Sequence, residues 1–338
     1  MGEMTLTDES AGVGLPVGIP DEEWADPDDP AAASARYHEY TSAADPIGSG
    51  YTPVLSVCTM ASGLVGDHPT GIEHFDLSDD LGVATPGVSG PATSPALLAS
   101  FLHILPGEVV TTEAIATSEL HIVLRGRGET DLANRSIRWA SGDVVVFPAG
   151  LPAVHRADDV GDPVVIYRVT DEPLLRYLGV VPTEARFAPT RWSAADIRRE
   201  LDTVAADPAA ANRNRVSILL ASEAHPQTLT ATHVLWAMYG LLPVGAVQRA
   251  HRHQSVALDL IVECEPGCFT LVGHEVDPNG DIVEPQRVDW EPGGAFVTPP
   301  GMWHAHFNES GAPARLFPVQ DAGLHTYLRS LDIRFVRG

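Results

Sequence analysis

The chain has 338 residues, of which 44% are hydrophobic and 20% are charged, a composition typical of a soluble globular protein with about two domains. Its formal net charge of −24 disfavours binding to nucleic-acid phosphates and to anionic membrane surfaces. The charge does not exclude a small anionic substrate, because a bound metal ion can dominate the field around it.

The sequence shows no membrane or secretion signal. No apolar run approaches the roughly 18 residues that a membrane span requires. The first residues, MGEMTLTDES, lack a basic segment followed by an apolar one, so we expect no signal peptide. The three cysteines, Cys58, Cys264 and Cys268, are too few for a disulfide framework, and we expect free thiols in a cytoplasmic protein.

In chain order, residues 1–50 are rich in Asp, Glu, Pro, Gly and Ala and predict an acidic, partly disordered arm. Residues 51–180 contain short apolar runs such as LHIVLRG and DVVVFPAG, which predict strands. Residues 181–225 include RWSAADIRRELDTVAAD, which predicts a helix with Ser193 as N-cap within a helical linker. Residues 226–338 return to strand-like runs such as ALDLIVEC. Many short strands with Gly and Pro turns predict barrels or sandwiches.

The two strand-rich parts share a pattern. GDVVVFPAGLPAVH in the first part aligns with GGAFVTPPGMWHAH in the second, so that Pro148 matches Pro299 and His155 matches His306. The LPG turn before the first copy and the LPVG turn before the second also correspond. The pattern predicts a duplication of one β-rich domain.

The second copy carries a candidate metal site. In GAVQRAHRH, His251 and His253 stand two residues apart, so that on a strand both side chains face the same side. In GGAFVTPPGMWHAHFN, the Pro-Gly turn places His304 opposite this pair. Three neutral imidazoles suit a divalent transition metal and leave open positions for a substrate.

These segments resemble the two sequence motifs of the cupin superfamily. The resemblance implies an all-β bicupin of two antiparallel double-stranded β-helix (jelly-roll) barrels with a helical connector. Many cupins have a glutamate ligand where this chain has Ala257, so the resemblance implies a site of three histidines. The first copy has Glu113, Ile115 and Ala153 at the ligand positions, and we expect its domain to lack the metal. Glu119, His121 and His155 offer a makeshift alternative there, which we rank below a structural role.

Longer segments narrow the resemblance. HRHQSVALDLIVE, TPPGMWHAH and VQDAGLHTYLRSLDIRF are similar to the metal-bearing cupin of the gentisate 1,2-dioxygenase group, which includes salicylate and 1-hydroxy-2-naphthoate dioxygenases. In that group the metal-bearing cupin comes first, so the order is reversed here. The resemblance implies an Fe(II)-dependent enzyme that opens a hydroxylated aromatic ring with O2; Mn, Ni or Zn are alternative metals. We also expect a homo-dimer or homo-tetramer.

Asp259 departs from this group, which has a substrate-binding arginine at that position. An aspartate there would repel a carboxylate, which leaves a phenol, a catechol-like or amine-bearing ring, or a β-dicarbonyl open as the substrate. The substitution also keeps two other functions open: a metal-dependent isomerase, lyase or decarboxylase, and a non-catalytic ligand-binding bicupin. We predict catalytic roles for Asp321, which matches an aspartate of the group, and for Asp259, as a base or as the partner of Arg249 or Arg252. The substrate pocket is predicted to include the following residues: Trp303, His306, Trp236 and Phe296.

Overall fold

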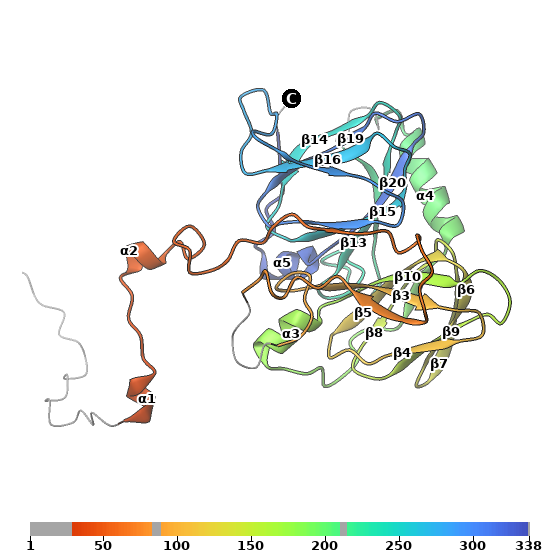
Figure 1. Ribbon diagram of the computed structural model, residues 1–338, viewed down its shortest axis with the longest axis horizontal. Helices are drawn as coiled ribbons and strands as arrows, with labels where there is room; N and C mark the ends of the chain where they lie inside the picture. Colours follow the sequence, from red (N-terminus) through yellow and green to blue (C-terminus); the bar gives the residue numbers. More distant parts are fainter. Residues whose placement is uncertain (1–28, 83–88, 210–214, 337–338) are drawn as a thin grey trace, which may run out of the picture. The chain divides into compact units, whose positions relative to one another are not determined.

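The computed structural model describes residues 29–82, 89–209 and 215–336 (Figure 1). The chain divides into two units, Met1–Thr52 and Pro53–Gly338. The described part of the first unit contains the short helices α1 (Pro30–Ala33) and α2 (Tyr40–Ala43). Residues 1–28 of the predicted arm lie outside the described residues.

The second unit confirms the predicted all-β fold, with two lobes that each consist of two antiparallel sheets (Figure 1). The strands of the N-terminal lobe are β2 (Gly71–His74), β3 (Leu98–Ile104), β4 (Val109–Thr112), β5 (Ser118–Arg125), β6 (Arg127–Leu132), β7 (Arg135–Ala140), β8 (Val144–Pro148), β9 (Ala153–Ala157), β10 (Val164–Thr170) and β11 (Thr190–Trp192). They form a six-stranded sheet of order β11-β8-β5-β10-β3-β2 and a four-stranded sheet of order β4-β9-β6-β7. Apolar side chains from both sheets fill the space between them.

The C-terminal lobe repeats this arrangement. Its strands are β1 (Thr59–Met60), β12 (Val216–Leu220), β13 (Trp236–Leu242), β14 (Val247–Arg252), β15 (Ala257–Glu263), β16 (Cys268–Gly273), β17 (Gln286–Asp289), β18 (Ala295–Thr298), β19 (Trp303–Asn308), β20 (Ala314–Gln320) and β21 (Arg334–Phe335). They form a six-stranded sheet of order β1-β18-β15-β20-β13-β12 and a five-stranded sheet of order β17-β16-β19-β14-β21.

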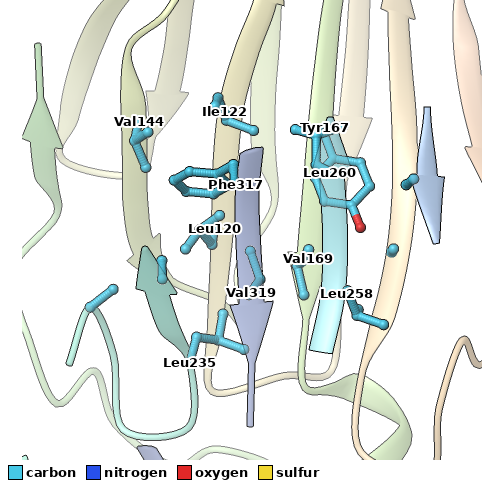
Figure 2. Close-up of a cluster of buried hydrophobic side chains, with 14 of the residues drawn as sticks. Leu120, Ile122, Val144, Tyr167, Val169, Leu235, Leu258, Leu260, Phe317 and Val319 are labelled. Atoms are coloured by element: carbon cyan, nitrogen blue, oxygen red, sulfur yellow. The ribbon is translucent and has the colours of Figure 1, made fainter. Parts of the chain in front are cut away.

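The six-stranded sheets of the two lobes pack against each other through one shared hydrophobic core. Figure 2 shows side chains from both lobes meeting there, among them Ile122 and Tyr167 from one lobe and Leu260 and Phe317 from the other. Because side chains alternate along a strand, the residues between these positions point into each lobe instead. Strands such as β5 and β15 are therefore buried on both faces, which explains why they read as nearly continuous apolar runs.

The predicted linker holds more than a helix. Helix α4 (Ala194–Ala206) is confirmed, with the Ser193 hydroxyl accepting a hydrogen bond from the Asp196 N–H at 3.1 Å. The same range also contains β11 and β12, which are edge strands of the N-terminal and C-terminal six-stranded sheets. Two further helices, α3 (Glu172–Leu178) and α5 (Ala322–Leu328), follow β10 and β20 at matching places in the two lobes.

The N-terminal segment contacts both lobes. Strand β1 pairs with β18 of the C-terminal lobe, where Thr59 lies opposite Phe296, and β2 then pairs with β3 of the N-terminal lobe. The Gly63 N–H also donates to the Gly293 carbonyl at 3.2 Å. Gly293 has a φ of 78°, and a Cβ there would lie 2.7 Å from the Ser62 hydroxyl, so the turn requires glycine.

None of the described helices is long and apolar enough to cross a membrane. All three cysteines are free thiols, as predicted.

Candidate metal centre

The structure brings His251, His253 and His304 together in the C-terminal lobe. One nitrogen of each ring lies within 4.8 Å of the other two, and each residue is at most 4% exposed. His251 and His304 are directly opposite each other on the paired strands β14 and β19. The Gly301 N–H donates to the His253 carbonyl at 2.7 Å, which ties the turn before His304 to the other two histidines.

Hydrogen bonds define which nitrogen each ring can offer. The Nδ1 atoms of the three rings each face a backbone carbonyl: His251 faces Arg249 at 3.3 Å, His253 faces Ser255 at 2.8 Å, and His304 faces Met302 at 3.1 Å. A carbonyl can only accept, so each Nδ1 carries the proton and each Nε2 keeps its lone pair. Amide nitrogens of Gln248 and Gln320 lie 3.4 Å from Nε2 of His251 and His253, consistent with Nε2 as an acceptor.

The three rings are neutral near pH 7. Burial lowers the pKa of His253 to about 4 and lowers the pKa values of His251 and His304 well below 6.5. The positive charge of Arg215 lowers all three further. Neutral imidazoles with free Nε2 atoms are the form that binds a metal ion, so these residues fit a site for one divalent transition metal.

A cavity of about 490 Å³ opens beside this cluster. Its polar lining includes His251, His253, Arg215, Gln248 and Gln320, and its apolar lining includes Trp236, Met238, Ile333 and Phe335. No acidic residue is among the described residues that line it. The cavity is therefore locally cationic within a protein of net charge −24 and favours an anionic ligand.

Arg215 is the principal site residue that sequence reasoning missed. It lies just before β12, within the range predicted as a linker, and its Nε donates to Gln248 Oε1 at 3.0 Å. Because β12 pairs with β13, the residue before it reaches the edge of the histidine cavity. The apolar run VSILL directly after Arg215 could have predicted a strand. A strand there places Arg215 at the edge of a sheet.

Of the residues predicted for the pocket, Trp236 lines the cavity. Its indole Nε1 has no hydrogen-bond partner in the described part of the chain, so it remains a free donor there. Phe296 does not line the cavity, because it packs into the hydrophobic core between the sheets of this lobe. Trp303 is also not among the lining residues and instead lies under the guanidinium of Arg252, 5.3 Å from the ring centroid.

His306 also lies outside the cavity lining. Its Nδ1 is 2.8 Å from the Thr270 hydroxyl, which in turn accepts from the indole Nε1 of Trp290 at 2.8 Å. The N-terminal lobe repeats this trio with His155, Thr130 and Trp139, at 2.9 Å for both contacts. The trio therefore occurs in both lobes and links strands within each of them.

Asp259 is buried within the lobe but does not line the cavity. The Thr298 hydroxyl donates to its carboxylate at 2.7 Å. Burial raises the pKa of Asp259 to about 6, while the Thr298 hydrogen bond and the charge of Arg215 oppose this rise. The guanidinium of Arg252 instead lies over the Trp303 ring.

Asp321 also lies outside the cavity lining. Its carboxylate accepts from the Val256 N–H at 2.9 Å and so fixes the turn that follows His253. Burial raises the pKa of Asp321 to about 7. In the N-terminal lobe, Asp171 stands at the matching place before α3 and accepts from the Thr117 N–H at 2.8 Å. The shared arrangement indicates that both aspartates hold a turn.

The N-terminal lobe has its own buried cluster, Glu119, His121 and His155. The carboxylate of Glu119 is already bound by the Arg168 guanidinium at 2.5 Å and by His121 at 3.1 Å. The Thr112 hydroxyl occupies the remaining side, at 3.0 Å from both the Glu119 carboxylate and His155 Nε2. The positive charge of Arg168 therefore neutralises the Glu119 carboxylate within the cluster. This agrees with a structural role for this lobe.

Comparison with known proteins gives a limited sequence match. No family model matches the chain. A segment of 101 residues is 32% identical to 5-aminosalicylate 1,2-dioxygenase from Comamonas sp. The match covers 30% of this chain and 26% of that protein, so the chain aligns with about a quarter of the length of this relative.

Solved structures show the fold over most of the chain. A mutant salicylate 1,2-dioxygenase from Pseudoaminobacter salicylatoxidans in complex with gentisate is 14% identical, with a TM-score of 0.60 over 80% of this chain and 79% of that one. Procruciferin, an 11S globulin from Brassica napus, is 13% identical, with a TM-score of 0.54 over 84% and 87%. The fold is therefore a bicupin fold, and function has to be argued from the site.

Proposed function

We propose that the protein is a ring-cleaving dioxygenase that acts on a small hydroxylated aromatic acid at an Fe(II) site held by His251, His253 and His304. The observation that carries the proposal is the cationic cavity, which joins this histidine cluster to Arg215. The sequence match to a 5-aminosalicylate dioxygenase and the shared fold with a salicylate dioxygenase support it.

Three neutral ligands would leave iron with its full charge, which favours a substrate whose hydroxyl and carboxylate both bind it. The bound iron would supply chelation and activation of O2. In the overall reaction, the bond between the ring carbons that carry the hydroxyl and the carboxylate breaks, and both oxygen atoms enter the product.

The chain's own residues would bind and orient the acid. The guanidinium of Arg215, oriented by its hydrogen bond to Gln248, is the donor for the substrate carboxylate. Trp236 and Phe335 provide flat apolar surfaces for the ring, and the free indole Nε1 of Trp236 can donate to a ring substituent. This arrangement would compensate for the absence of an arginine at position 259, because Arg215, just before β12, supplies the positive charge.

The two predicted catalytic aspartates would act indirectly. Asp321 positions the turn that carries the acceptor for His253. Asp259 acts through its charge, since it interacts electrostatically with Arg215 without lining the cavity. Trp303, His306 and Phe296 do not line the cavity. They could contact a substrate, as predicted, only if the ligand extended beyond it.

Oxygen uptake tests the proposal. The protein is loaded anaerobically with Fe(II) and then given salicylate, 5-aminosalicylate, gentisate, catechol or a 1,3-diketone with oxygen. Uptake with the acids and loss of the aromatic absorption would support the proposal. Absence of uptake from the loaded protein with every compound would overturn it, and consumption of a compound without uptake would instead indicate a lyase, isomerase or decarboxylase.

The quaternary structure and location belong to the same proposal. We expect a cytoplasmic homo-dimer or homo-tetramer with the metal-bearing cupin second in the chain, and the three free thiols agree with a reducing compartment. Light scattering of the purified protein measures the oligomeric state.

A further inference from the structure

A second group of potential ligands lies on the N-terminal lobe, away from the proposed iron site. His68 and Glu73 belong to the segment that leads into and forms β2, and His103 is on the neighbouring strand β3. The Glu73 carboxylate is 3.7 Å from His68 Nδ1 and 3.7 Å from His103 Nε2. One ligand atom of each residue lies within 4.8 Å of the others.

The hydrogen bonds leave these ligand atoms unused. His68 Nε2 is 2.8 Å from the Val65 carbonyl, so Nε2 carries the proton and Nδ1 keeps its lone pair. His103 is only 5% exposed, and its Nε2 has no hydrogen-bond partner among the described residues. A buried imidazole nitrogen without a partner is costly, which indicates a missing ligand.

The spacing is close to that of a metal site. A tetrahedral ion with bonds of about 2.0–2.1 Å holds its ligand atoms about 3.3–3.5 Å apart, slightly closer than the two 3.7 Å separations here. The His68 and His103 rings are stacked, with centroids 4.0 Å apart and planes 9° apart. One ring must therefore turn, and His68 can do so because it lies on a partly exposed loop.

The surroundings favour a cation. A cavity of about 550 Å³ adjoins the two histidines and is also lined by Asp67 and Asp162. The guanidinium of Arg125 lines it too, and its Nε and Nη1 donate to the carbonyls of Pro163 and Leu64, at 3.1 and 3.3 Å. Together with Glu73, the carboxylates of Asp67 and Asp162 carry more negative charge than Arg125 carries positive charge.

We propose that His68, Glu73 and His103 bind a divalent transition metal ion of the zinc class, with water completing the coordination. The site is independent of the proposed iron site. A bound ion would hold the segment between β1 and β2 against strand β3. Strand β1 is at the edge of a C-terminal sheet, and β2 is at the edge of an N-terminal sheet. Its effect is on stability rather than on catalysis.

Zinc titration of metal-free protein tests this proposal. The full chain with His251→Ala and His304→Ala, which lacks the proposed iron site, should bind one Zn²⁺ per chain by calorimetry. Adding His103→Ala should abolish this binding. Adding His74→Ala should retain it, because His74 lies next to Glu73 on β2 but outside the cluster, where it pairs with the Ser100 hydroxyl at 2.8 Å. Zn²⁺ should raise the midpoint temperature of unfolding by about 2 °C or more in the double variant and in the double variant with His74→Ala. It should leave the midpoint unchanged in the double variant with His103→Ala.

No zinc binding by the first variant, or binding that survives His103→Ala, would overturn the proposal. If the double substitution prevents folding, wild type and His103→Gln replace these variants. Wild type should then bind two Zn²⁺ and His103→Gln one. Equal stoichiometry in the two proteins would count against the site, and the result is separate from the oxygen-uptake assay.

Discussion

Arg215 and Asp259 interact electrostatically across the C-terminal lobe. Burial lowers the pKa of Arg215 and the Asp259 carboxylate opposes that shift, while Arg215 in turn opposes the rise in the pKa of Asp259. Each group therefore favours the charged form of the other. Only Arg215 lines the cavity beside His251 and His253, so the positive member of the pair is the one available to a ligand.

Arg215→Met should weaken binding of an aromatic acid. Loss of a charge-assisted hydrogen bond costs about 1.5–3 kcal/mol, which predicts a KM raised by about 10- to 100-fold with a smaller change in kcat. Arg215→Lys should fall between wild type and Arg215→Met, because a lysine keeps the charge but loses the planar pair of donors. Steady-state oxygen uptake with salicylate or its amino derivative measures both constants.

Arg287→Met provides the matched control, since Arg287 is exposed in the same lobe and pairs with Asp289. It should leave KM unchanged. An unchanged KM in Arg215→Met would remove Arg215 from substrate binding.

His304→Ala should lose the iron of the proposed site. Removing one of three ligands leaves a pair that cannot hold the ion through purification, so bound iron should fall from about one per chain to near zero. His274→Ala is the control, because His274 is exposed and outside the cluster. Iron analysis after anaerobic loading and desalting gives the occupancy, and full occupancy in His304→Ala would rule out the triad.

Asp259→Asn should change how stability depends on pH. The folded protein keeps a proton on Asp259 up to about pH 6, whereas the unfolded chain releases it near 3.8, so stability decreases as the pH rises between these values. The neutral amide has no such dependence and can still accept from Thr298. At pH 8 the variant should be more stable by about 3 kcal/mol, with little difference at pH 4.

Urea unfolding with chelator at the two pH values measures this difference, and comparison with wild type cancels the titration of the histidines. Parallel stability curves for the two proteins would mean that Asp259 is ionised in the folded state throughout this range.

Phe317→Ala should destabilise both lobes together. Phe317 is fully buried in the core that the two large sheets share (Figure 2), and its truncation should cost about 3–5 kcal/mol. Leu151→Ala, at a residue that is 63% exposed, should cost less than about 0.5 kcal/mol. Unfolding followed by tryptophan fluorescence and by far-UV circular dichroism should give coincident transitions, and two separated transitions would show that the lobes unfold independently.

The sequence predicted the features that depend on local spacing. The alternation in HRH and the Pro-Gly turn before His304 are sufficient to predict which side chains meet, because the strand period fixes their direction. The helix after Ser193 was predictable for a similar reason, since capping is a local interaction.

Features that depend on pairing between distant segments were missed. Arg215 reaches the cavity only because β12 pairs with β13, and a short run inside a predicted linker did not reveal that pairing. Phe296 was predicted to line the pocket as one of several aromatic residues in the second copy, but it packs into the core between the sheets of its lobe. The alternation gives the face of a strand and does not show how far along the strand the cavity extends.

The pairing of β1 with β18 has a consequence for synthesis on the ribosome. The first strand of this unit completes a sheet whose other members lie within residues 216–320, whereas β2–β11 form the sheets of the N-terminal lobe. All strands of the N-terminal lobe have been translated before β18, whereas β1 must wait for β18 before it can pair. Cutting the chain at α4 would therefore not yield two complete halves, because the later fragment would lack its own edge strand.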